Sequence, residues 1–179
     1  KSSSNDGVSS RSDNISDALK KGLDGAIVSS PATAHIAQAR QLVDAGLGLL
    51  IEKPLAVDAN EAREFVLYAR ARDATCLLGY LLRHSEAAQE FKSYLESAFL
   101  GKILHVHAEC GSYLPEWRPG CDYRKSVSAN NSLGGGVLLE LSHEIDYLNW
   151  FFGPFSSVMG RVKNTGVLSP KLWFFGPCQ

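Results

Sequence analysis

Short apolar runs alternate with segments of helical spacing through the first half of the chain. Runs at residues 25–29, 48–51 and 75–80 predict three buried strands, because each is too short for a helix. Apolar residues at helical spacing after Pro31 and after Asp58 predict the connecting helices, and residues 15–21 predict a shorter one. Apolar strands joined by helices are typical of a parallel α/β sheet with helices on both faces.

Helix boundaries in this half carry their own signals. Ser30-Pro31 predicts an N-cap followed by proline at the first helical position, and Gly46 ends that helix. Asp58 with Glu61 three residues later forms a capping box.

The pattern changes after Tyr80 and predicts a second, α+β unit. Ser85 caps a helix to about Leu100, and the alternation over residues 103–112 predicts a strand. A long loop (113–133), a helix over residues 136–152 and a strand over 156–163 follow. We therefore expect two units, the C-terminal half of a dinucleotide-binding domain at residues 1–82 and part of a mainly antiparallel α+β domain at 83–179.

Composition narrows the class of protein without naming a function. The 179 residues include 18 Lys+Arg and 19 Asp+Glu, so the charge balance favours neither nucleic acid nor an anionic membrane surface as a partner. The start is polar and no apolar run approaches the length of a membrane span, so we expect no leader and no membrane segment. Four cysteines without a C-x-x-C pair favour reduced thiols in a cytoplasmic protein.

The strongest local chemical signal is Glu52-Lys53-Pro54, directly after a predicted parallel strand. Ligands of open α/β sheets bind beyond the carboxyl ends of the strands, so Lys53 is well placed for chemistry. A partly buried lysine beside a positively charged ring can exchange a proton near neutral pH, as a general acid/base must. The alternative is a surface lysine that ends a strand.

Two further patterns point to a ligand site. Glu140, His143 and Tyr147 share one face of a predicted helix, where a carboxylate one turn away can orient the imidazole. A solvated helix face would show the same pattern. Ser30 and Pro31 place a helix N-terminus at a strand end, an arrangement that suits phosphate but that any N-cap shares.

His105, His107 and Glu109 lie on one face of the predicted strand and are plausible zinc ligands by type. The outer two are separated by about 13 Å along a strand, too far to converge on one ion, so we expect no metal site. Neither G-x-G-x-x-G nor a P-loop occurs in the chain.

Taken in order, these motifs resemble the Gfo/Idh/MocA oxidoreductases, the NAD(P)-dependent relatives of glucose–fructose oxidoreductase, inositol dehydrogenase and the rhizopine-catabolism protein. The resemblance covers about residues 15–165 and rests on the segments 24–35, 45–55, 79–83, 101–103 and 134–146.

The resemblance implies a role for each matching residue. Lys53 would exchange the proton of a substrate hydroxyl while hydride passes to or from NAD or NADP, with His143 assisting and Glu140 at the family's usual Asp position. The remaining expected positions are Ser30, Pro31, His35, Glu52, Lys53 and Pro54 for the cofactor, and Tyr80, Arg83, Trp117, Arg118, Tyr123 and His143 for the substrate.

Three departures from the family pattern shape the functional hypothesis. Glu140 precedes His143 by three residues rather than four, the first strand and the glycine-rich turn are missing, and the ending after Leu168 shows no strand pattern. We therefore expect a fragment truncated at both ends, with weak or absent cofactor affinity on its own. The parent would be an oxidoreductase of a sugar, nucleotide-sugar or cyclitol hydroxyl and a homo-oligomer; the alternative is a non-catalytic sugar- or dinucleotide-sensing relative.

Overall fold

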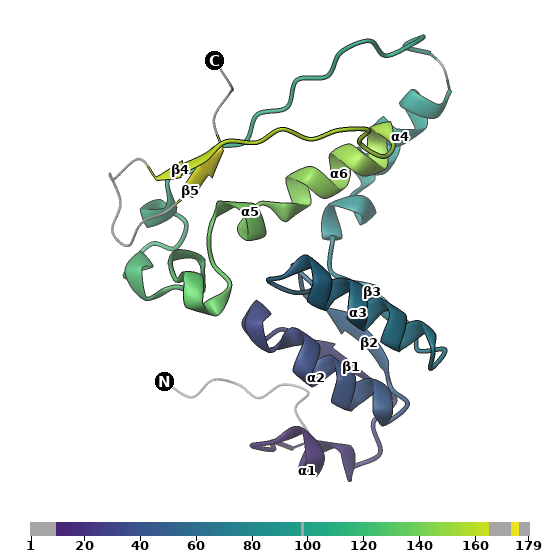
Figure 1. Cartoon of the computed structure of the whole chain (residues 1–179), viewed down its shortest axis with the longest axis vertical. Coiled ribbons are helices and arrows are strands. Elements are labelled where there is room, and N and C mark those ends of the chain that lie inside the picture. Colours follow the sequence, from purple (N-terminus) through teal and green to yellow (C-terminus); the bar gives the residue numbers. More distant parts are fainter. Residues whose placement is uncertain (1–9, 98, 165–172, 176–179) are drawn as a thin grey trace.

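The computed structural model describes residues 10–97, 99–164 and 173–175. Helices and strands alternate through the first half, as predicted (Figure 1). The elements are α1 (Ile15–Leu19), β1 (Gly25–Val28), α2 (Ala32–Asp44), β2 (Gly48–Ile51), α3 (Ala59–Arg70) and β3 (Cys76–Leu78).

The three strands form a parallel sheet in the order β1-β2-β3. One face of the sheet packs against α2, where Val28 and Ile51 meet Ile36 in the core. On the opposite face Ile27 is 70% exposed and Leu77 is 65% exposed. The parallel sheet is confirmed, but helices cover only one of its faces in the described part of the chain, so the expectation of two covered faces was wrong.

Local capping sets the helix starts. The Asp58 carboxylate accepts hydrogen bonds from the backbone N–H groups of Asn60 and Glu61, which confirms the predicted N-cap of α3. For α2 the prediction was one residue early, because Pro31 occupies the N-cap position without a side-chain cap. Ser30 lies outside the helix, and its hydroxyl donates to Gln38 Oε1 at 2.7 Å instead.

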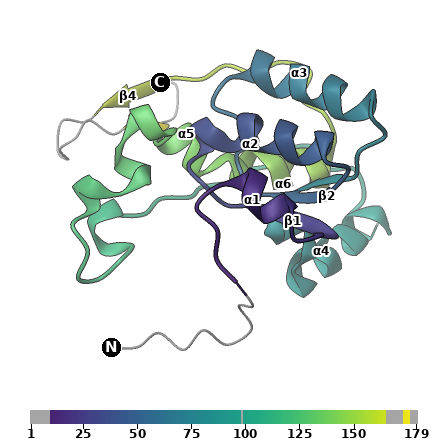
Figure 2. The ribbon, with the colours of Figure 1, turned by 90° about the horizontal axis from the view of Figure 1, so that it is seen from below.

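The second half is built from helices and short turns. Ser85 caps α4 as predicted, although α4 ends at Glu96. Four 3₁₀ turns occupy the predicted loop at 113–133, which lies to one side of α2 in Figure 2. The elements are η1 (Leu81–His84), α4 (Glu86–Glu96), η2 (Leu114–Glu116), η3 (Tyr123–Lys125), η4 (Val127–Ala129), η5 (Asn131–Leu133), α5 (Val137–Glu140), α6 (Ser142–Phe152), β4 (Val162–Asn164) and β5 (Trp173–Phe175).

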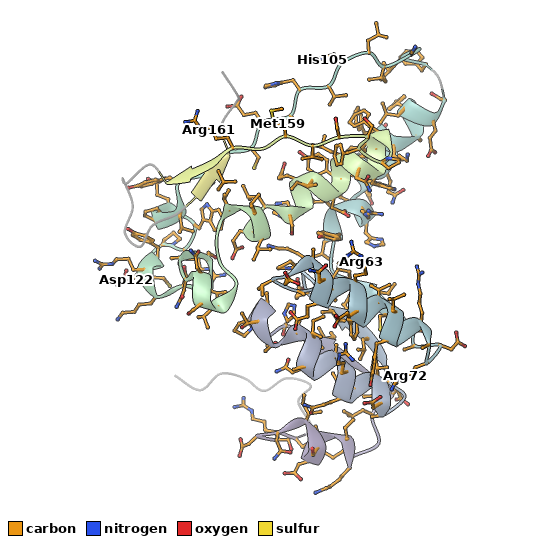
Figure 3. The ribbon with its side chains drawn as sticks, viewed as in Figure 1. Arg63, Arg72, His105, Asp122, Met159 and Arg161 are labelled. Atoms are coloured by element: carbon orange, nitrogen blue, oxygen red, sulfur yellow. The ribbon has the colours of Figure 1, made fainter. Side chains whose placement is uncertain are left out.

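The strand predicted at residues 103–112 was wrong. This segment is extended, but no described residue pairs with it in a ladder, and it runs clear of the parallel sheet with His105 near its outer end (Figure 3). Alternating side chains satisfy only one condition for a strand, because the backbone N–H and C=O groups also need a partner strand.

The last strands also differ from expectation. Of the strand predicted at 156–163 only Val162–Asn164 forms, and it pairs antiparallel with Trp173–Phe175. The ending was expected to contain no strand, so β5 corrects that prediction. None of the described helices is long and apolar enough to cross a membrane.

Candidate active site

Lys53 lies just beyond the carboxyl end of β2, and its amine reaches across to the second half of the chain. Lys53 Nζ donates a hydrogen bond to the backbone carbonyl of Glu140 at 2.8 Å and lies 3.5 Å from Glu140 Oε2. The two side chains are 24% and 22% exposed, so the ammonium and the carboxylate meet in a partly desolvated place. The structure thus brings together two of the three predicted catalytic residues.

A break in the predicted helix 136–152 makes this contact available. The helix divides at Leu141 into α5 and α6, which corrects the expectation of one continuous helix. In an uninterrupted helix the Glu144 N–H would bond to the Glu140 carbonyl, but here it donates to the Leu141 carbonyl at 3.0 Å. The Glu140 oxygen therefore remains open to accept from Lys53.

The glycine run 134–136, just before α5, packs against the half of the chain that contains the parallel sheet. A Cβ on Gly134 would lie 2.7 Å from Val57 Cγ1 and 3.0 Å from Ala32 Cβ, so the loop packs directly on the start of α2. Gly134 also has φ +85°, which favours glycine. The sequence predicts a helix that begins at the end of this run, but the close approach of the run to α2 is a role that sequence reasoning missed.

His143 is held by a residue other than the one predicted. His143 Nε2 lies 3.3 Å from Glu144 Oε1, while Glu140 contacts Lys53. Tyr147 donates from its hydroxyl to Glu144 Oε2 at 2.5 Å. Burial, followed by this hydrogen bond to Glu144, raises the pKa of Tyr147 to about 12.

Cys110 completes this cluster from the extended segment. Burial and the nearby Glu144 carboxylate raise the pKa of the Cys110 thiol. Glu144 was missed in the sequence because it immediately follows His143, and adjacent residues do not usually share a helix face. The hydroxyl of the neighbouring Ser142 is buried without a hydrogen-bond partner in the described structure.

The loops after β1 and β2 are tied together by His35. Its Nε2 lies 2.8 Å from the Ser30 carbonyl oxygen and its Nδ1 lies 2.8 Å from the Pro54 carbonyl oxygen. His35 is 1% exposed, so its ring is enclosed by protein. The expected direct contact of His35 with a cofactor is therefore not supported by this geometry.

The remaining expected cofactor residues stay at the strand ends. Glu52 is half-buried, and a Cβ on Gly79 would lie 3.2 Å from Glu52 Oε2, so the ends of β2 and β3 approach closely there. Pro31 is half-buried at the start of α2, and the Lys53–Pro54 peptide is cis. Because Gly134 packs on the first turn of α2, this helix N-terminus is partly covered, which disfavours the predicted phosphate position.

Two adjoining cavities hold three of the six expected substrate residues, whereas Arg83 and His143 line neither. The larger, of about 510 Å³, is mainly apolar and includes Glu140, Glu144 and Trp117 in its lining. The smaller, of about 330 Å³, brings together Trp117, Arg118 and Tyr123. Trp117 belongs to both, so the cavities are neighbours; Tyr80 lines neither and lies half-buried after β3.

Arg83 has a protein partner in place of the expected substrate. Its guanidinium donates two hydrogen bonds of 2.7 Å to the Asp146 carboxylate, and its CZ atom lies 5.8 Å from the centroid of the Trp150 ring. The Asp146 carboxylate raises the pKa of Arg83. This bidentate pair joins η1 to α6, so we assign Arg83 a structural role.

The side chains of His105, His107 and Glu109, which were considered as zinc ligands, do not form a cluster. His107 Nε2 lies 3.7 Å from Glu109 Oε2, and both side chains are largely exposed. No three His, Cys, Asp or Glu side chains among the described residues are grouped as a metal site would require.

Comparison with known proteins places this geometry in a family. Residues 3–80 match the model described as "Oxidoreductase family, NAD-binding Rossmann fold", and residues 88–168 match the "GFO/IDH/MocA C-terminal domain". The chain is 31% identical over 147 residues to trans-1,2-dihydrobenzene-1,2-diol dehydrogenase of Macaca fuscata fuscata, covering 79% of this chain and 42% of that protein.

Solved structures share the fold. Myo-inositol 2-dehydrogenase from Lactobacillus plantarum matches with a TM-score of 0.70 and 20% identity, over 89% of this chain and 46% of that one. The WlbA dehydrogenase from Bordetella pertussis, in complex with NADH and UDP-GlcNAcA, matches with a TM-score of 0.65 and 22% identity, over 84% of this chain and 43% of that one.

The chain spans less than half the length of these relatives. It covers 42% of the diol dehydrogenase and 36% of a second curated relative, an oxidoreductase of Synechocystis. The two family models match nearly all of it in the family's order, and the expected NAD cofactor is confirmed at the level of the family. One family model matches the half that contains the parallel sheet, and the other matches the half that follows it. The chain therefore belongs to the Gfo/Idh/MocA family of oxidoreductases.

Proposed function

We propose that these residues serve an NAD(P)-dependent oxidoreductase that transfers hydride between nicotinamide and a ring hydroxyl of a sugar, nucleotide-sugar or cyclitol. The observation that carries the proposal is the Lys53 amine, held 2.8 Å from the Glu140 carbonyl beyond the carboxyl end of a parallel strand. Relatives named for myo-inositol and for a cyclic diol, and a third solved in complex with UDP-GlcNAcA, support a cyclic secondary alcohol as the substrate.

We assign residues 1–82 to the cofactor side and residues 83–179 to the substrate side. The family matches support this division, since one ends at residue 80 and the other begins at residue 88. The half-buried polar groups of Glu52 and Lys53 at the end of β2 suit the nicotinamide riboside end of the cofactor. They do not suit the pyrophosphate, because Gly134 covers the start of α2.

In the oxidation direction the substrate carbon loses a hydride and its hydroxyl loses a proton, leaving a carbonyl. The bound nicotinamide supplies the hydride acceptor. We assign Lys53 Nζ to take the hydroxyl proton, and the Glu140 carbonyl oxygen orients the amine by accepting one of its N–H groups. We assign His143, whose Nε2 lies 3.3 Å from Glu144 Oε1, to hold a substrate hydroxyl.

Substrate recognition is assigned to the two adjoining cavities. Trp117 and Tyr123 offer flat apolar faces of the kind that sugar rings pack on, and Arg118 adds a cation in the smaller cavity. Glu140, which lines the larger cavity, connects it to Lys53.

The test is Lys53→Met in a full-length version of the protein, assayed by NADH absorbance with myo-inositol and a UDP-sugar acid at high NAD concentration. We expect turnover to fall by about 10²–10⁴-fold, the usual contribution of a general acid/base. Lys20→Met is the control, because Lys20 is exposed on α1 and pairs with Asp17. Turnover that survives Lys53→Met would contradict the proposed role of Lys53, whereas no turnover in the unsubstituted protein would favour a non-catalytic sensing relative.

A further inference from the structure

His35 is the most enclosed polar side chain in the described structure, and it lies between two loops. It extends from α2 and meets carbonyl oxygens of Ser30 and Pro54, each at 2.8 Å. Ser30 belongs to the loop after β1 and Pro54 to the loop after β2. One ring thus touches both loops that follow adjacent parallel strands.

A neutral imidazole carries one N–H, so His35 donates a hydrogen bond to one of these carbonyls and contacts the other through its second nitrogen. A hydrophobic side chain of the same size would remove that hydrogen bond. His35 is 1% exposed, so water does not reach its ring, and an unpaired buried carbonyl is costly. Two ring nitrogens on opposite sides of a flat, rigid ring also fix the distance between the two oxygens. His35 therefore acts as a spacer of fixed length.

Gln38 strengthens one side of this arrangement. It lies one helical turn after His35 and accepts a hydrogen bond from the Ser30 hydroxyl at 2.7 Å. The loop after β1 is thus held at its carbonyl by His35 and at its hydroxyl by Gln38. The loop after β2 meets α2 through the 2.8 Å contact of His35 Nδ1 with the Pro54 carbonyl oxygen.

Pro54 immediately follows Lys53, so the position of its carbonyl limits where the lysine side chain begins. The Lys53 amine then spans to Glu140, which belongs to the other half of the chain. We propose that His35 is a positioning residue, which acts through Pro54 to hold Lys53 in register with the Ser30 loop on the cofactor side. Its importance for hydride transfer rests on the proposed function, whereas the coupling of the two loops does not.

Hydrogen–deuterium exchange of the 179-residue chain tests the coupling. In His35→Ala we expect exchange at both residues 29–31 and residues 52–55 to rise by about tenfold, the effect of losing a buried hydrogen bond. Gln38→Leu should raise it only at residues 29–31. Val43→Ala is the matched control, because Val43 is buried at the far end of the same helix and should loosen neither loop selectively.

Acylation of lysines gives a second readout that general destabilisation would not move. In His35→Ala the labelling rate of Lys53 relative to exposed Lys20 should rise several-fold, and in Val43→Ala it should stay unchanged. If His35→Ala does not fold, His35→Gln keeps one amide donor and should open one of the two loops. Both loops staying protected in His35→Gln, or His35→Ala matching Val43→Ala, would overturn the inference. No measurement here uses cofactor or turnover, so its failure is separate from failure of the Lys53→Met test.

Discussion

Replacing Gly135 with alanine is expected to be the most damaging single-methyl change in the second half of the chain. The added Cβ would lie 2.2 Å from the Val127 carbonyl oxygen, 2.7 Å from that of Ser128 and 2.9 Å from that of Asn130. Relief requires a backbone shift of about 1 Å, because all three neighbours are main-chain atoms rather than flexible side-chain ends. Overpacking of this kind costs about 3 kcal/mol, the upper end of its usual range.

Thermal unfolding followed by circular dichroism measures this effect. A loss of about 3 kcal/mol corresponds to a fall in Tm of about 6–12 °C for a chain of this size. Gly111→Ala is the matched control, since a Cβ there would meet nothing within 4 Å and its φ is not positive. Gly134→Ala should fall between them, because its closest neighbour is the Val57 side chain. Equal Tm values for Gly135→Ala and Gly111→Ala would refute the reasoning.

Two further predictions concern groups near the site. Asp146→Asn should destabilise the chain by about 1–2 kcal/mol, after allowance for solvent screening, because it removes the charge that binds the Arg83 guanidinium. A double-mutant cycle with Arg83→Met in urea measures the coupling, and additive effects would contradict it. The difference in 295 nm absorbance between the wild type and Tyr147→Phe should titrate at about pH 12. Since folding raises this pKa, the associated stability is present below about pH 10 and is lost as the pH rises through about 12; a midpoint near 10 would contradict the assignment.

Local patterns were sufficient to predict the parallel sheet half. Three apolar runs with intervening helical periodicity determine β1, β2 and β3, and the Asp58 cap is a contact between residues three apart or less. Local patterns could not predict that helices cover only one face of the sheet, because this depends on which segments distant in the sequence pack against each face. Exposed Ile27 and Leu77 carry the same apolar signal as the buried residues of the sheet.

The sequence predicted which residues belong to the site better than it predicted which atoms they contact. Lys53 was identified from its place after a strand, and Glu140 from its place on a helix near His143. That Lys53 would bond to a backbone oxygen could not be read from side-chain identities. The roles of His35 and Arg83 were assigned to ligands by resemblance, whereas their partners are Ser30, Pro54 and Asp146, which lie 5, 19 and 63 residues away.

The break at Leu141 has a consequence for how this site tolerates sequence change. Because Lys53 is anchored to a main-chain oxygen, any residue at position 140 supplies that acceptor, and exchange of Asp for Glu leaves it in place. The path of the backbone is less permissive, since a regular helix through residue 141 would pair the oxygen with the Glu144 N–H and withdraw it from the lysine. The site is therefore more vulnerable to insertion or deletion between residues 136 and 143 than to point substitution at residue 140, and the shortened acid–histidine spacing of this chain falls across that same break.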